Sequence, residues 1–515
     1  MATFSSSGPI SAKAIRDFVN NTSTVAATNI SIHNLFTTAN SAGVFTLPNG
    51  NFTVPHAFSE WYSAEDFDPS TRIAIGALWN DNGTATPRSY AGHVRVFEWN
   101  GSSWSQLGSD IDGNPTGNVV NYTLGTDVAL SADGNTLIVS GAEGVNSQNA
   151  GYVHIYDWNG SSWNQRGSTL VGTIHTMSGN LGTVDDQLGL SVSISADGDT
   201  IVIIAPRTVH NVLKMKTEIY DWSGTAWTQR GSDILADANF DGMYGPYTGA
   251  VAVGDVALSS DGNVVATGYP GHQVGNTYSQ WDGQVKVHVW NASSSTWVQR
   301  GANLENPLHA NTDYYSSLYG DAISLNGDGT ILVIGTWGVT SNVVNTPTLY
   351  NRGMVEVFQW NATTSTWNQM GSTIFGAGST TSSGGGDNFG HDVSLSDDGL
   401  TMAASAPGHD SNKGTVRVYY WSGTAWVQKG SDIDGEFGVS TSNPTGDRSG
   451  TSIMLSPNGH SIIIGATWNN GSAGVNSGHA RIFDWNGTNW VQRGNDIDGE
   501  YSYDLAGYSV AFARA

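Results

Sequence analysis

Cysteine is absent from the sequence, which excludes a disulfide framework and a thiolate metal site. Charge is scarce as well: 12% of the residues are charged, against about 25% in average globular proteins. It is also one-sided, because 20 Lys and Arg face 44 Asp and Glu and leave a net charge of −24. Such a surface repels phosphate backbones and anionic lipids, so we expect no nucleic-acid partner.

Long apolar runs are missing too. None approaches the ~18 residues that a spanning helix needs, so we expect no membrane insertion. The first residues, MATFSSSGPIS, lack the basic and apolar regions of a secretory signal. We therefore expect a soluble protein; if it works outside a cell, it would leave by a route other than a visible signal.

Turn residues and aromatic rings are abundant, with 65 Gly, 19 Trp and 19 Tyr in 515 residues. This balance is typical of an all-β protein with many turns. The length exceeds that of one ordinary domain, which favours several domains or an array of repeats.

A hairpin with two Trp residues recurs seven times after Thr71. Each copy has a Trp, a short Asn- or Ser-rich turn, a second Trp and a Gln two residues later. The pairs are Trp99/Trp104, Trp158/Trp163, Trp222/Trp227, Trp290/Trp297, Trp360/Trp367, Trp421/Trp426 and Trp485/Trp490. Six copies follow a second hairpin of the form G-x-(D/S)-V-x-L-S-x-D-G plus an apolar run, so each unit predicts four short strands.

The first copy lacks the first strand of this second hairpin, and a matching strand occurs at the other end of the chain. Residues 507–513, GYSVAFA, match its first strand, and Asp68–Thr71 align with its turn. One unit is thus shared between residues 68–113 and 501–515, as in a closed ring rather than a linear solenoid. We predict an all-β fold, a seven-bladed β-propeller over residues 68–515, closed by the C-terminal strand joining the first blade.

A propeller of this size spreads its core between facing blades. In the strand VRVFEW, Val94 and Val96 point to one face, while Phe97 and Trp99 point to the other. We expect one face to be buried against each neighbouring blade.

Residues 1–67 differ from the repeats and predict a small N-terminal α/β appendage. GPISAKAIRDFVN has the apolar spacing of a short helix, and VFTLPNGNFTV that of a hairpin turning at Asn49-Gly50. The segment has too few apolar residues for a large core of its own.

The repeats resemble a family of marine bacteria, algae and their viruses whose members read roughly GYSVSLSADGNTVAIGAP…GHVRVYEWNGSSWTQ-GSDIDGE. The likeness is clearest in NFGHDVSLSDDGLTMAASAP…GTVRVYYW. It implies a propeller distantly related to the FG-GAP blades of integrin α, a fold that adhesins, surface proteins and virion parts share. FG-GAP blades carry a D-x-D-x-D-G calcium loop in the first hairpin, where this chain has only S-x-D-G.

The N-terminal segment resembles virion structural proteins of tailed phages and large aquatic viruses. SSSGPISAKAIRDFVN, TNISIHNLF and VPHAFSEWYS are similar to their GPISLSDIR…ISLSDFY pattern. This resemblance implies small helical anchors, contact with other virion proteins through residues 1–67, and a place in the virion as a fibre, tail or capsid-surface component.

Two sets of carboxylates are candidate cation ligands. Asp237, Asn239 and Asp241 match the first half of an EF-hand-like loop, although Thr248 stands where the bidentate Glu should be. They form either a Ca²⁺ site, which is the one cofactor we consider, or an ordinary polar loop. The sequence Asp-Ile-Asp-Gly also recurs, at Asp110/Asp112, Asp432/Asp434 with Glu436, and Asp496/Asp498 with Glu500. Its carboxylates either bind a hard cation together or belong to a solvated turn.

Other repeated or inserted residues have two interpretations each. The polar ring formed by Asp127, Ser191, Asp255, Ala322, Asp392, Ser452 and Ser509 could bind water, a cation or a sugar, but we favour a role in capping neighbouring backbone groups. His93 and His479 occupy equivalent positions and are interpreted as repeat residues rather than ligands. Aromatics in the variable loops either stack on sugars or plug the blade tops, at Trp79, Trp281, Trp337 and Trp468.

The sequence shows no nucleophile–base pairing, no paired acid and base, and no strong metal motif, so we expect no enzymatic activity. The first hypothesis is a virion structural protein whose propeller contacts host surface glycans, a receptor or neighbouring virion proteins. The second is a secreted or cell-surface, lectin-like adhesion propeller of a marine bacterium or alga. A hydrolase or lyase on the same scaffold is the third.

Overall fold

The computed structural model describes the residues in these ranges: 46–47, 50–51, 72–81, 90–113, 123–141, 150–176, 183–185, 187–209, 212–236, 254–272, 282–308, 314–315, 318–341, 348–380, 385–440 and 443–513. The chain divides into two compact units, Met1–Asp68 and Pro69–Ala515, which are taken separately.

In the first unit, β1 (Thr46–Leu47) pairs antiparallel with β2 (Gly50–Asn51), so the expected hairpin is present. Leu47 lies opposite Gly50, so Gly50 belongs to the second strand and not to the turn, unlike in the predicted Asn49-Gly50 turn. The predicted helix in GPISAKAIRDFVN lies outside the described residues.

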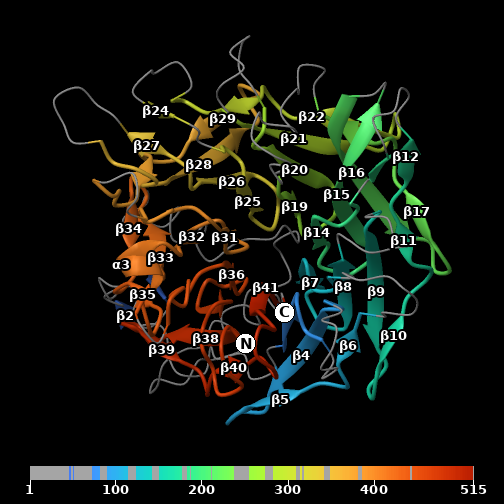
Figure 1. The fold of residues 1–515 in the computed structure, drawn as a ribbon. Helices are drawn as coiled ribbons and strands as arrows, with labels where there is room; N and C mark the ends of the chain where they lie inside the picture. Colours follow the sequence, from blue (N-terminus) through green and yellow to red (C-terminus); the bar gives the residue numbers. More distant parts are fainter. Residues whose placement is uncertain are drawn as a thin grey trace. The chain divides into compact units, whose positions relative to one another are not determined.

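The second unit is a ring of seven antiparallel sheets, which confirms the predicted seven-bladed propeller. Figure 1 shows the inner strand of each sheet around a common centre: β41, β7, β14, β19, β25, β31 and β36. Each blade has a fifth strand beyond the four predicted, two residues long, which pairs with the third strand. The Asp-Ile-Asp stretches form this strand in blades 1, 6 and 7 and are not simple turns.

The strands of blades 1 to 3 are as follows. Blade 1 holds β41 (Ala506–Phe512), β3 (Arg72–Ala77), β4 (His93–Trp99), β5 (Trp104–Gln106) and β6 (Ile111–Asp112). Blade 2 holds β7 (Val128–Leu130), β8 (Thr136–Gly141), β9 (Tyr152–Trp158), β10 (Trp163–Gln165) and β11 (Leu170–Val171). Blade 3 holds β14 (Ser191–Ile194), β15 (Thr200–Val209), β16 (Val212–Trp222), β17 (Trp227–Gln229) and β18 (Ile234–Leu235).

The remaining blades repeat this order. Blade 4 holds β19 (Val256–Leu258), β20 (Val264–Tyr269), β21 (Gln284–Asn291), β22 (Thr296–Gln299) and β23 (Leu304–Glu305). Blade 5 holds β25 (Ala322–Leu325), β26 (Ile331–Thr336), β28 (Met354–Asn361), β29 (Thr366–Gln369) and β30 (Ile374–Phe375). Blade 6 holds β31 (Val393–Leu395), β32 (Thr401–Ala406), β33 (Thr415–Trp421), β34 (Trp426–Gln428) and β35 (Ile433–Asp434). Blade 7 holds β36 (Ser452–Leu455), β37 (Ser461–Ala466), β38 (His479–Trp485), β39 (Trp490–Gln492) and β40 (Ile497–Asp498).

Outside the blades, the described residues of the second unit form two small sheets and one helical turn. The sheets pair β12 (Ile174–Thr176) with β13 (Thr183–Asp185) and β24 (Tyr314–Tyr315) with β27 (Thr340–Ser341), and the helical turn is α3 (His409–Asn412). Among the described residues, no helix has the length and apolar character needed to cross a bilayer.

The S-x-D-G turn is held by its own polar side chains. In blade 2, the Ser131 hydroxyl donates to Asp133 at 2.7 Å and accepts the Thr136 amide at 2.9 Å, while Asp133 accepts the Asn135 amide at 2.9 Å. Gly134 follows at φ +64°, which favours glycine because a side chain would be strained there. The repeat of this motif thus has a structural cause.

The core lies between blades, as predicted. Val94 and Val96 pack with Val128 and Leu137 of blade 2, whereas Phe97 packs against blade 7. One such cluster of buried apolar side chains fills each of the seven interfaces in the ring.

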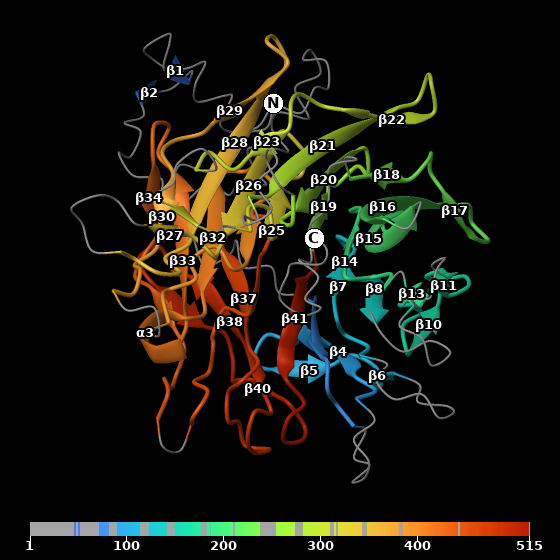
Figure 2. The same cartoon turned by 45° about the horizontal axis from the view of Figure 1, so that its top comes forward.

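The Trp hairpins latch each blade to the one before it. The second Trp donates its indole N–H to a backbone carbonyl of the preceding blade, as from Trp490 to Lys429 at 2.8 Å and from Trp104 to Arg493 at 2.9 Å. The basic side chain of the accepting residue often lies over the same Trp pair, as Lys429 does over Trp490 at 5.5 Å. Figure 2 shows the hairpin strands β17 and β22 projecting at the outside of their blades.

A substitution pair tests this latch. Trp490→Ala should destabilise the protein by about 3–5 kcal/mol, because it removes a large packed ring and leaves the Lys429 carbonyl without its donor. Val491→Ala is the control: this neighbour is 49% exposed, and its loss should change stability by less than about 0.5 kcal/mol. Equal melting temperatures of the two variants would contradict the assignment.

Candidate functional site

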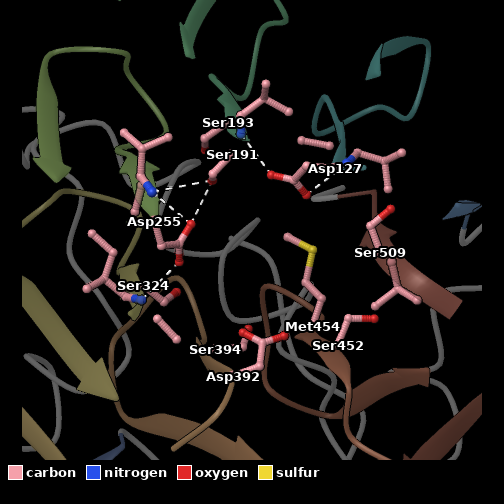
Figure 3. A pocket seen from close by; sticks show the side chains of 18 of the residues that line it. Asp127, Ser191, Ser193, Asp255, Ser324, Asp392, Ser394, Ser452, Met454 and Ser509 are labelled. Carbon is pink, nitrogen blue, oxygen red and sulfur yellow. Dashed lines mark hydrogen bonds between the residues drawn. The ribbon is translucent and has the colours of Figure 1, made fainter. Parts of the chain in front are cut away.

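A cavity of about 330 Å³ opens where the inner strands begin, and residues from all seven blades line it. Figure 3 shows three aspartates, Asp127, Asp255 and Asp392, with serines between them around this opening. They belong to the polar ring found in the sequence, so the structure brings that ring together at one mouth of the channel.

Each ring aspartate bridges two blades. One carboxylate oxygen of Asp392 accepts the amide of its own neighbour Val393 at 2.7 Å, and the other accepts the amide of Ile453 in the next blade at 2.6 Å. Asp127 accepts Val128 and, across the interface, Val192, each at 2.8 Å. These bonds occupy both oxygens of each carboxyl group with backbone donors, which confirms the favoured capping role.

Asp255 makes the same bridge and also receives a serine. It accepts the amides of Val256 at 2.7 Å and Ile323 at 2.9 Å, and the Ser191 hydroxyl donates to it at 2.7 Å. The aspartates therefore stand in blades 2, 4 and 6, and each reaches into the blade that follows.

Serines link the interfaces around blade 1. Ser452 donates to the Gly507 carbonyl and Ser509 to the Gly125 carbonyl, both at 2.9 Å. Asp occupies the ring position in blades 2, 4 and 6, but with seven blades a strict alternation of Asp and Ser cannot close. Blades 7 and 1 therefore both have a serine, and these two serines make the hydrogen bonds on either side of the closing strand β41.

Blade 5 departs from the pattern, because Ala322 occupies the ring position there. The polar group is supplied one residue earlier by Asp321, which accepts the indole N–H of Trp337 at 2.8 Å. Sequence alignment of the repeats missed Asp321 because it is out of register with the ring. The one feature of the sequence that could have pointed to Asp321 is the apolar Ala322 at a ring position where the other blades have Asp or Ser.

The enclosed position of these carboxyl groups changes their acidity. The pKa of Asp127 is raised to about 7, mainly by burial; the hydrogen bond from the Val192 amide opposes this shift and the negative Asp255 contributes to it. Burial raises the pKa of Asp392 to about 8 and that of Asp321 to about 7. The pKa of Asp255 is raised by burial as well. The mouth therefore gains negative charge as the pH rises through neutrality, so it repels anions and attracts cations more strongly at higher pH.

The loop tryptophans in the described part of the chain all have partners within the protein. Trp79 lies half-buried against Tyr90, with ring centroids 5.6 Å apart, and Trp468 lies under the Arg448 guanidinium at 5.4 Å. Trp337 reaches the cavity rim through Asp321. Within the described residues, none of these three rings contacts another of the three, and whether they also contact a sugar stays a prediction.

Several predicted ligands lie outside the described residues. These are Trp281 and the candidate calcium ligands Asp237, Asn239 and Asp241. The calcium site at that loop therefore stays a prediction.

The fold and the polar channel mouth define the protein as a closed seven-bladed β-propeller. No protein-family model matches the sequence, and no curated protein matches it either. Among solved structures, it is similar to the periplasmic gluconolactonase PpgL of Pseudomonas aeruginosa, with 13% identity, a TM-score of 0.48, and coverage of 84% of this chain and 97% of that one. It is also similar to Sqt1 of Chaetomium thermophilum, with 12% identity, a TM-score of 0.41, and coverage of 84% and 86%. At such identities the likeness concerns the fold alone.

Proposed function

We propose that the protein is a non-enzymatic virion structural protein whose propeller binds host surface glycans. One observation supports the binding role most directly: the connections between second and third strands differ widely in length from blade to blade, and they belong to the face around the polar channel mouth.

The strands of each blade alternate in direction, so connections between second and third strands lie on the face where the inner strands begin. These connections range from residues 210–211 in blade 3 to residues 337–353 in blade 5. On the opposite face, turns from the inner to the second strand are constant in length, as at residues 131–135 and 456–460. Variable loops on a rigid scaffold are typical of binding surfaces.

Two exposed aromatic residues lie on this variable face. Phe437 is 61% exposed and Tyr501 is 49% exposed, and each follows the Glu that ends an Asp-Ile-Asp-Gly-Glu motif. Aromatic faces stack on sugar rings. Because the protein carries a net charge of −24, we expect neutral glycans to bind and sulfated or sialylated glycans to be repelled.

The virion assignment rests on the resemblance of residues 1–67 to virion structural proteins. Mass spectrometry of purified particles and of host fractions tests it. We expect the protein in the particles, joined to other virion proteins through this segment. Recovery only from a cell surface or culture medium would favour the adhesion propeller instead.

A glycan array tests the binding face. The double substitution Phe437→Ala/Tyr501→Ala should weaken binding at least tenfold while leaving the melting temperature unchanged, because both side chains are exposed. The matched control is Val298→Ala/Val427→Ala, two exposed apolar residues on fourth strands, which should bind normally. Turnover of a glycan, or binding that only the control reduces, would refute the proposal.

A further inference from the structure

Two clusters of one histidine and two carboxylates lie on the same face of the ring, at equivalent places in blades 1 and 7. In each, one nitrogen or oxygen atom per side chain lies within 4.8 Å of the other two. The clusters are His93, Asp110 and Glu500, and His479, Asp496 and Glu436. The histidine begins the third strand and the Asp precedes the fifth strand of the same blade, while the Glu comes from the preceding blade.

The histidines are buried without hydrogen bonds. His93 is 0% exposed and His479 is 1% exposed, and neither ring nitrogen of either residue has a hydrogen-bond partner. The nearest carboxylate oxygens are 3.8 Å from Nδ1 of His93, on Glu500, and 3.6 Å from Nδ1 of His479, on Asp496. Buried polar groups usually have a hydrogen-bond partner, so two buried imidazoles without one, at equivalent positions, indicate that a binding partner is missing.

Burial, together with smaller contributions from the neighbouring Arg95 and Arg481, lowers the pKa of His93 to about 3 and that of His479 to about 4. A lowered pKa favours the neutral imidazole, whose nitrogen can donate a lone pair. Neutral imidazole is the form that binds metals.

Blade 6 shows what the same positions do without a histidine. Thr415 replaces the histidine and donates to Asp434 at 2.8 Å, and Arg417 binds Asp432 directly at 2.9 Å. All the polar groups named here are paired within the blade.

In blades 1 and 7, the arginine equivalent to Arg417 turns elsewhere. Arg95 donates to the Asp498 carbonyl at 2.6 Å and Arg481 to the Asp434 carbonyl at 2.8 Å, both in the preceding blade. Arg95 keeps only a looser pairing with Glu500, at 3.6 Å from Oε1, and Oε2 is the oxygen that faces His93. Neither arginine donates to the Asp of its cluster, so that carboxylate is available to bind another cation.

We propose that the two clusters are equivalent binding sites for a divalent transition metal, zinc or a close analogue, held between neighbouring blades. One imidazole nitrogen with two carboxylate oxygens is a catalytic-type or open ligand set for zinc, whereas calcium and magnesium take oxygen ligands alone. Ligand atoms bound to tetrahedral zinc lie roughly 3.4 Å apart, so atoms that now lie within 4.8 Å of one another need to approach by at most about 1.4 Å. Water would complete the coordination.

Neighbouring side chains hold the ligands and leave a path for the ion. Gln492 donates to Oδ1 of Asp496 at 2.6 Å, while Oδ2 faces His479, and Gln106 binds Asp110 at the same distance. Outer hydrogen bonds of this kind orient metal-binding carboxylates. Glu436 and Glu500 are exposed, so the ion can enter from solvent.

The two sites share one motif, which places them at the seam of the ring. Asp496 belongs to the site between blades 6 and 7, and Glu500, four residues later, belongs to the site between blades 7 and 1. The chain then enters β41, the strand that closes the ring. Metal at these sites would tie blade 6 to blade 7 and blade 7 to blade 1, and so would stabilise the closure.

Equilibrium dialysis of the full chain against micromolar zinc, with excess magnesium, tests the proposal. We expect two zinc ions per chain, one in His93→Gln or His479→Gln, and none in the double variant. Zinc should raise the melting temperature of the natural protein and not that of the double variant. Cobalt(II) in place of zinc should give visible absorption bands that both substitutions together abolish.

Two further variants keep the result interpretable if a buried substitution prevents folding. Glu436→Gln and Glu500→Gln change exposed residues and should each remove one ion. Asp432→Asn, the blade 6 counterpart, should keep both ions. Absence of bound zinc in the natural protein, or an unchanged zinc content in the folded His93→Gln/His479→Gln or Glu436→Gln/Glu500→Gln variants, would overturn the proposal.

Discussion

Deletion of residues 507–515 is expected to open the ring and abolish its cooperative unfolding transition. The strand β41 pairs with β3 along most of its length, with Phe512 opposite Ile73 and Val510 opposite Ile75. Without it, blade 1 has no inner strand, and blades 7 and 2 lose the neighbour that lies between them at the centre of the ring.

The size of the effect follows from what β41 buries. Phe512 is fully buried and packs with Ile73, Ile463 and Ile482, so it joins blade 1 to blade 7. Phe512→Ala alone should cost about 3–5 kcal/mol, a large part of the roughly 5–15 kcal/mol that keeps a typical protein folded. The deletion removes this side chain, the strand pairing and the Ser509 bond to Gly125 together.

Calorimetry and circular dichroism of the truncated chain measure this effect. A second truncation that removes only residues 514–515, beyond β41, is the control and should melt like the full chain. A synthetic peptide of residues 501–515 should restore the transition when added to the long truncation. If the long truncation melted at the temperature of the full chain, the shared blade would not be what closes the ring.

The fold could be predicted because its causes are local and repeated. Each S-x-D-G turn is satisfied by its own Ser and Asp, and each Trp hairpin makes the same indole bond to the blade before it. Because the pattern occurs in seven blades, each copy supports the same strand assignment independently. GYSVAFA then indicated that the ring is closed. It matches the inner strand of a blade, but the chain ends before the second strand that should follow it, so it has to pair with a strand from the start of the propeller.

The clusters between blades could not be predicted in this way. His93 and Glu500 lie at opposite ends of the propeller sequence, and their distance depends on the twist and packing of blades 1 and 7. The repeat suggested that His93 and His479 were equivalent, but not that a Glu from the preceding blade approaches each of them. Asp321 was missed for a related reason, since Trp337 folds back on it from the end of another strand.

The polar ring makes the stability of the protein fall as pH rises through neutrality. Burial raises the pKa of Asp127 to about 7 and of Asp392 to about 8, whereas both titrate near 3.8 in the unfolded chain. Between these values the folded state binds more protons, so its stability is greatest below the unfolded pKa and declines up to about pH 8. One unit of difference is about 1.4 kcal/mol, so even one unit at each residue would cost about 3 kcal/mol.

Comparing the natural protein with Asp127→Asn/Asp392→Asn by chemical denaturation from about pH 5 to about pH 9 isolates this contribution. The amide cannot ionise, and it can accept only one of the two backbone amides that each carboxyl group now accepts. We therefore expect the variant to be less stable at low pH, and the difference to shrink as the pH rises.

The matched control for this comparison is Asp261→Asn. Asp261 sits in an S-x-D-G turn, where hydrogen bonds from Ser259 and Asn263 outweigh its partial burial and keep the pKa below its ordinary value. It is ionised throughout the range, so its replacement should leave the pH slope unchanged. A double variant with the same slope as the natural protein would show that the ring aspartates stay ionised in the fold, and that the backbone amides around the channel mouth stabilise their charge more than burial opposes it.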